Sequence, residues 1–148
     1  MLHYTRKIIL GILIFLLLGI FRLVILLFPF RWYDKWLTHT FEREQSCGWR
    51  KVQLVENKKF GYARLIGRVV ANVSNYTPWQ SKCLVQSLVT KFLLRRFNIA
   101  NTMFVGVGFD EAQEFISHAW VVVNAVIIVG GHDSPQKYKT IKTFEDSH

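Results

Sequence analysis

The sequence predicts an α+β domain in which helices come first and a small antiparallel sheet follows, with a hydrophobic helix ahead of both. Ile8 to Phe28 is almost wholly apolar, and apolar residues then recur at helical spacing between Phe60 and Phe97. Runs rich in Val, Ile and Phe, separated by turn-forming residues, follow from Thr102 to Val129. A chain of 148 residues holds one compact domain behind such a segment.

The first element is a hydrophobic helix over residues 1–30. Its apolar stretch, at 1.5 Å per residue, covers the roughly 30 Å of a bilayer's hydrocarbon. Arg22 counts against a spanning helix, because an arginine at the centre costs roughly 2.5–3.5 kcal/mol, although off-centre it reaches the headgroups. We therefore predict a membrane-associated helix. The alternative is a helix that docks on the rest of the chain or on a partner, with Arg22 on its solvent-exposed side.

The remaining chain divides into three parts. Residues 31–57 mix aromatic and basic side chains, which is typical of a membrane interface and equally of an aromatic core, and form a connector in which Cys47 is a bystander. Residues 58–138 are predicted to form the folded domain, which contains the candidate site residues described below. Residues 139–148 are polar and are predicted to be a loose C-terminal tail.

Charge and cysteine content exclude several classes of protein. The net charge of +9 comes from basic residues that are spread along the chain. This distribution favours a solvent-exposed basic face, and the second possibility is a face that binds a membrane or peptide surface. No nucleic-acid motif accompanies them, so no nucleic-acid partner is expected. The two cysteines, Cys47 and Cys83, lack the Cys-x-x-Cys spacing of zinc ribbons and redox pairs. We expect no metal and no organic cofactor.

Five regular elements are predicted behind the apolar segment. The first helix, from Phe60 to Ser74, ends before Tyr76-Thr77-Pro78, and the second runs from Ser81 to Phe97 with Arg95-Arg96 at its negative end. The strands are Thr102 to Phe109, Ile116 to Val123 and Val126 to Val129.

Cys83 and His118 are the candidate nucleophile and general base. Cys83 falls in the first turn of the second helix, where a helix N-terminus favours the reactive thiolate. The alternative role is that of a small buried hydrophobe. His118 lies inside the second strand, where a polar ring is costly to bury without a partner. Taken alone, it is more often a hydrogen-bonded core or surface histidine.

Hairpin geometry nominates Asp133 as the third catalytic residue. If Asn124-Ala125 is a two-residue turn, Val123 pairs with Val126 and His118 lies opposite Gly131. Asp133 then shares that face and reaches diagonally to the imidazole, fixing its tautomer. A three-residue turn would instead place His132 opposite His118.

Gln80, just ahead of the second helix, is a candidate oxyanion donor beside the backbone N–H of Cys83. Donors of this kind contribute roughly 3–4 kcal/mol where they have been measured. A surface glutamine in a loop is the alternative reading.

Six stretches together resemble the lasso-peptide leader peptidases, which are bacterial transglutaminase-like enzymes. A Cys at a helix start followed by a His on a strand is also the chain order of papain-like and transglutaminase-like thiol enzymes. The stretches are Phe28–Arg31, Trp79–Leu88, Leu93–Ile99, Val105–Val107, His118–Val121 and Gly130–Asp133.

The resemblance implies a transglutaminase-like, papain-like fold and removal of a leader from a lasso-peptide precursor. Cys83 would attack the amide between leader and core peptide, His118 would shuttle the proton, and Asp133 would complete the triad. It also implies two partners: a separate winged-helix protein that binds the leader, and an ATP-dependent cyclase that closes the lasso ring. The catalytic domain would face the bacterial cytoplasm.

Two other functions fit the same residues. A non-catalytic, membrane-bound scaffold would use the fold to bind a peptide, and its binding would be insensitive to alkylation of the thiol. Acyl transfer to an amine needs the same Cys and His chemistry as hydrolysis.

Overall fold

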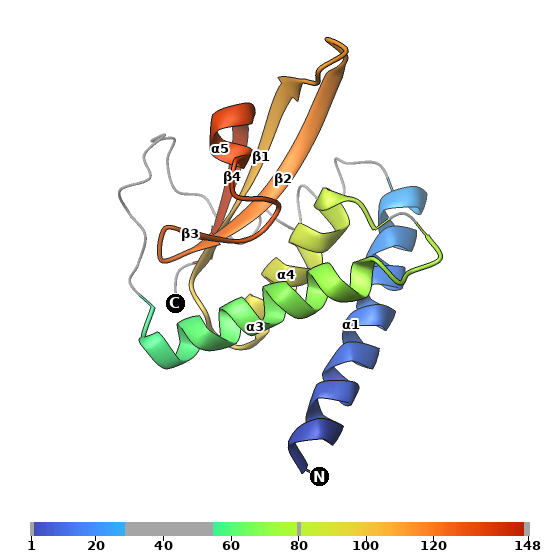
Figure 1. Ribbon diagram of the computed structural model, residues 1–148, viewed down its shortest axis with the longest axis vertical. Coiled ribbons are helices and arrows are strands. Elements are labelled where there is room, and N and C mark those ends of the chain that lie inside the picture. The colour runs from blue at the N-terminus through green and yellow to red at the C-terminus, as the bar shows by residue number, and fades with distance from the viewer. Residues whose placement is uncertain (1, 29–54, 80, 147–148) are drawn as a thin grey trace.

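The computed structural model describes residues 2–28, 55–79 and 81–146, and shows a mixed α+β fold as the sequence predicts (Figure 1). The sheet is antiparallel throughout, with the strand order β3-β2-β1-β4. The elements, in chain order, are α1 (Leu2–Leu27), α3 (Asn57–Ser74), α4 (Cys83–Arg96), β1 (Asn101–Phe109), β2 (Phe115–Val123), β3 (Val126–Val129), α5 (Ser134–Lys137) and β4 (Lys139–Asp146).

Helix α4 is the centre of the domain, because it contacts α1 and α3 as well as three of the strands. It buries Val85, Leu88 and Val89 in the core shared with the sheet. Its C-terminal end is closed by Asn98 in the left-handed conformation (φ 50°), and the Ile99 N–H donates to the Leu94 carbonyl over 2.9 Å. This is a Schellman end, and it fixes where the helix stops and β1 begins.

Helix α3 crosses β3 at Gly67, where the two backbones come unusually close. A Cβ at Gly67 would lie 2.5 Å from the Ile128 carbonyl oxygen, so only glycine fits there. Ile66 and Val70 on the same helix are buried against the sheet and α4. The contact explains how an amphipathic helix with exposed basic residues is held in place.

The turn between β2 and β3 forms as predicted, but the register beyond it differs. Asn124 and Ala125 both have positive φ (50° and 60°), which is the two-residue hairpin geometry, and Val123 pairs with Val126. A bulge at Ile128 of β3 then pairs Val121 with Val129, and β3 ends there. The predicted pairing of His118 with Gly131 is therefore wrong, because the bulge shifts the register by one residue.

The segment from residue 139, predicted to be a loose tail, is strand β4 as far as Asp146. It pairs with β1 along its whole length, for example Thr143 with Phe104. Alternate residues point inward, and Phe144 and Asp146 are buried. The prediction failed because most residues of this strand are polar, so the alternating pattern is hidden.

Helix α1 packs one side against α3 and α4 and leaves the other side bare. Ile14 and Leu18 are fully buried, and the rings of Phe15 and Trp79 lie 5.1 Å apart. A Cβ at Gly19 would also lie 3.1 Å from the Trp79 ring. Large apolar side chains are exposed elsewhere on the helix: Ile8, Ile9, Ile12, Leu13, Leu16, Ile20, Leu23, Leu26 and Leu27.

In the part of the chain that the structure describes, one helix is long and apolar enough to cross a membrane, at Ile8–Leu27. Because Trp79 lies four residues before Cys83, the side of α1 that is docked touches the loop leading to the nucleophile.

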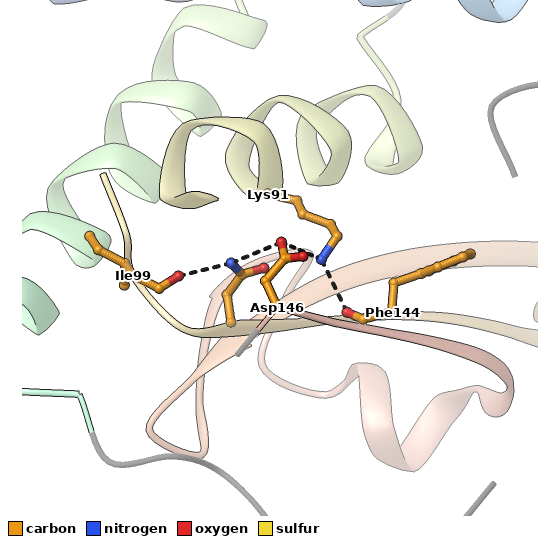
Figure 2. Close-up of polar contacts among 5 residues, drawn as sticks. Lys91, Ile99, Phe144 and Asp146 are labelled. Carbon is orange, nitrogen blue, oxygen red and sulfur yellow. Dashed lines mark hydrogen bonds and ion pairs between the residues drawn. The ribbon is translucent and has the colours of Figure 1, made fainter. Parts of the chain in front are cut away.

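A buried ion pair fastens β4 to α4 (Figure 2). The Lys91 ammonium donates to Asp146 Oδ2 over 2.7 Å and to the Phe144 carbonyl over 3.3 Å. Asn101 Nδ2 donates to the Ile99 carbonyl (3.0 Å) and lies 3.4 Å from the same carboxylate oxygen. Burial lowers the pKa of Lys91, and the Asp146 carboxylate opposes that shift. The Asp146 carboxylate therefore offsets part of the cost of burying the Lys91 ammonium.

We expect Lys91→Met to lower the free energy of unfolding by about 3–5 kcal/mol, because it leaves the Asp146 carboxylate buried without its counter-ion. The double variant Lys91→Met/Asp146→Leu should recover most of that loss. Urea unfolding followed by circular dichroism, in detergent to keep α1 soluble, measures both.

Lys137→Met is the matched control, since it also removes a lysine from an ion pair, here with Asp133 at the surface. Its unfolding midpoint should equal that of the wild type. A Lys91→Met variant as stable as this control would show that the buried pair does not hold β4.

Candidate active site

Cys83 is the first residue of α4, so its thiol lies at the positive end of the helix dipole. Lys82 before it is extended (φ −67°, ψ 169°), and the helical turns begin at the cysteine itself. The partly buried thiol hydrogen-bonds the side chain of His118 and also contacts the backbone of Ala119 and Leu84. Helix α4 and strand β2 thus meet at the sulfur atom.

His118 lies between the thiol and a backbone carbonyl. Its Nε2 is 2.5 Å from the carbonyl oxygen of Gly130. Since a carbonyl only accepts, Nε2 carries the proton, and Nδ1 is the ring nitrogen left for the thiol. The neutral ring therefore presents a lone pair to the sulfur, which is the tautomer that a general base needs.

Both members of the pair have shifted pKa values. Burial raises the pKa of Cys83, but the hydrogen bond and charge of His118, with the Ala119 and Leu84 backbone, outweigh it and lower the pKa overall. The hydrogen bond to Cys83 raises the pKa of His118, burial opposes this, and the Gly130 carbonyl adds to it. Opposite shifts in two touching groups favour a thiolate beside an imidazolium.

The Gly130 carbonyl is held by strong local constraints. Gly130 and Gly131 both have positive φ (110° and 87°). A Cβ at Gly130 would lie 2.4 Å from the Trp120 Cβ and 2.7 Å from the Ala119 carbonyl oxygen. The buried Ser134 hydroxyl donates to the same Gly130 carbonyl. Only glycine can place this carbonyl against the imidazole.

Asp133 is not brought to His118. Its carboxylate is exposed and pairs with Lys137 over 3.1 Å, and that lysine lowers the pKa of the Asp133 carboxyl. The bulge in β3 and the turn at Gly130-Gly131 carry Asp133 to the start of α5 instead. The predicted triad geometry therefore differs from the structure, in which a backbone carbonyl holds the imidazole.

The loop before Cys83 is tied down by hydroxyl groups. Thr77 Oγ1 lies 2.8 Å from the Ser74 carbonyl and 2.9 Å from Ser81 Oγ. The Gln86 amide donates to the Ser81 carbonyl over 2.8 Å. Gln80, the predicted oxyanion donor, and Cys47 lie outside the described residues.

Two components of the site were not predicted from the sequence. The Gly130 carbonyl has no side-chain signature, and only the paired glycines signal an unusual backbone there. The second is Tyr138, whose ring lies 4.7 Å from that of His118. Within the described ranges, no cluster of three or more His, Cys, Asp and Glu residues is placed to hold a metal ion.

We expect Cys83 to react with iodoacetamide at a pH well below the ordinary pKa of a thiol. The rate should fall as pH drops through the lowered pKa of Cys83, because the thiolate is the reactive form. His118→Ala should move this transition toward the usual thiol range, near 8.5. Peptide mass spectrometry separates Cys83 from Cys47; unchanged pH dependence in His118→Ala would disprove the ion pair.

Gly130→Ala should abolish this low-pH reactivity, because its methyl group would displace the carbonyl that sets the tautomer. Asp133→Asn should leave it unchanged, since Asp133 faces Lys137. The same alkylation assay on both variants decides the point. Loss of reactivity in Asp133→Asn, with the fold intact by circular dichroism, would restore Asp133 to the catalytic group.

Comparison with known families agrees with this geometry. Residues 24–143 match the model of the transglutaminase-like superfamily, and this range contains both Cys83 and His118. No curated protein and no solved structure shows a significant match to the chain. A match over most of the chain, with a thiol at a helix start and a histidine on the following sheet, places this chain in the transglutaminase-like superfamily.

Proposed function

We propose that this chain is a cysteine peptidase that removes the leader from a lasso-peptide precursor. The observation that carries the proposal is the contact between Cys83 and His118, with the imidazole tautomer set by the Gly130 carbonyl. The substrate is inferred from the sequence resemblance to lasso-peptide leader peptidases.

In the first half-reaction, the Cys83 thiolate attacks the carbonyl carbon of the amide between leader and core. A carbon–sulfur bond forms, and the carbonyl oxygen takes the negative charge. The backbone N–H of Cys83, with Gln80, is the proposed donor set for this oxyanion. His118 gives its Nδ1 proton to the departing nitrogen, the carbon–nitrogen bond breaks, and the core peptide leaves with a free amine.

In the second half-reaction, water resolves the thioester. His118, now neutral, takes a proton from the water through Nδ1 as the hydroxide adds to the thioester carbonyl. The carbon–sulfur bond then breaks, which releases the leader as a carboxylate and restores the thiolate. Nε2 keeps its proton throughout, because the Gly130 carbonyl only accepts.

The partners follow from the same proposal. A separate winged-helix protein would deliver the leader, and an ATP-dependent cyclase would use the freed amine. The apolar helix supports a membrane-associated enzyme. The resemblance to lasso-peptide leader peptidases favours a catalytic domain on the cytoplasmic side. Since α1 touches Trp79, the membrane and the nucleophile loop would lie close together.

We expect a lasso precursor incubated with this protein and the leader-binding partner to yield a leader fragment ending in a free carboxylate. Cys83→Ala should yield none, because no other thiolate contacts His118 in the described part of the chain. Mass spectrometry of the products measures the result. Cleavage should also fall at high pH as His118 deprotonates through its raised pKa.

Lys82→Ala, next to the nucleophile but exposed, is the matched control and should cleave normally. Product mass separates the alternatives: an adduct on an added amine indicates acyl transfer, and the hydrolysed leader indicates a peptidase. Cleavage that persists in Cys83→Ala would refute the proposal. Bound but uncut precursor with the folded wild type would favour the scaffold.

A further inference from the structure

The ring of Tyr138 covers one face of the catalytic imidazole. Tyr138 directly follows α5, and its ring lies 4.7 Å from that of His118 at an interplanar angle of 22°. The ring of Trp120 lies 6.3 Å from the imidazole and 6.4 Å from Tyr138. His118 is thus part of an aromatic stack that reaches from β2 to the end of α5.

Two glycines of β1 provide the room for this stack. A Cβ at Gly106 would lie 3.0 Å from the Tyr138 Cβ and equally close to the Trp120 ring. A Cβ at Gly108 would lie 2.7 Å from the Lys137 carbonyl oxygen and 3.1 Å from the Tyr138 ring. Glycine weakens a strand interior, so its presence twice in β1 indicates that another segment must approach closely. That segment is the one that carries Tyr138.

The two hydrogen bonds of the imidazole do not prevent the ring from rotating about the axis that joins them, so a third contact is needed to hold it. Nδ1 faces Cys83 and Nε2 faces Gly130, so the two contacts define a single axis through the ring. The ring can still rock about that axis. A flat group stacked on its face opposes the rocking and also favours a positive charge on the imidazole.

We propose that Tyr138, seated on Gly106 and Gly108, is a positioning residue that holds the His118 imidazole in line between Cys83 and Gly130 and stabilises its protonated form. The proposal rests on the thiol chemistry inferred above for Cys83 and His118. Tyr138 acts through its ring, whose aromatic face contacts the imidazole.

The effect of the Tyr138 ring on His118 can be separated from the effects of the neighbouring charged and titratable groups. Cys83, from α4, is the titratable side chain that shifts His118. Lys137, beside Tyr138, is paired with Asp133 at the surface, away from the imidazole. A change in Tyr138 can therefore be interpreted without a change in a neighbouring charge.

The test is the rate of Cys83 alkylation by iodoacetamide across pH, which requires no peptide substrate. Tyr138→Leu keeps an apolar side chain but removes the aromatic face, and should lower the rate at pH 6 roughly two- to five-fold. Tyr138→Phe retains the face and should match the wild type. Tyr62→Ala, which removes an exposed tyrosine of α3, is the control and should also match it.

Gly108→Ala tests the packing of Tyr138 on β1 without changing Tyr138 itself. Its added methyl group should push Tyr138 off the imidazole and lower the rate at pH 6 by a similar factor. Combined with Tyr138→Leu, it should give little further loss, because both changes remove the same contact. This variant also serves if Tyr138→Leu fails to fold.

Three outcomes overturn the inference: wild-type reactivity at pH 6 in folded Tyr138→Leu, an equal loss in Tyr138→Phe, or wild-type reactivity in Gly108→Ala. Each leaves the Cys83–His118 pair intact as a proposal. A wild-type protein whose Cys83 titrates as an ordinary thiol, in contrast, would refute the proposed function itself. The two failures are thus distinguishable in one experiment.

Discussion

A partly buried thiol becomes a thiolate only if a neighbour stabilises the charge, and His118 is that neighbour. Burial alone raises the pKa of Cys83. The shift is reversed because α4 begins at the sulfur and β2 brings His118 to the same point. The packing of α4 against the sheet, the bulge in β3 and the glycine turn after β3 all help to position the two residues of this contact.

The helices, the first three strands and the two candidate residues Cys83 and His118 could be identified from the sequence because their signals are local. The apolar spacing of α3 and α4 and the Val- and Ile-rich runs of β1 to β3 each reflect burial of one element. Cys83 and His118 were found because a thiol at a helix start and a polar ring inside a strand are both unusual. These features are encoded by the side chains themselves.

The remaining features depend on contacts between distant backbone segments. The bulge in β3 has no composition signal, yet its shift of one residue moved Asp133 away from His118. The group that replaced it, the Gly130 carbonyl, is main chain. Strand β4 was missed because its inward residues include Asp146, which is buried only since Lys91 neutralises it. A carboxylate in the core cannot be recognised before its partner is known.

The Lys91–Asp146 pair also bears on the order in which the protein is made. Lys91 lies in the helix that carries the nucleophile, and its counter-ion follows 55 residues later in the chain. While the ribosome has not yet delivered Asp146, α4 must either keep Lys91 in water or bury a lone ammonium. The helix therefore cannot settle against the finished sheet during most of synthesis. Helix α4, which begins at Cys83, can therefore reach its final packing only after β4 has been synthesised.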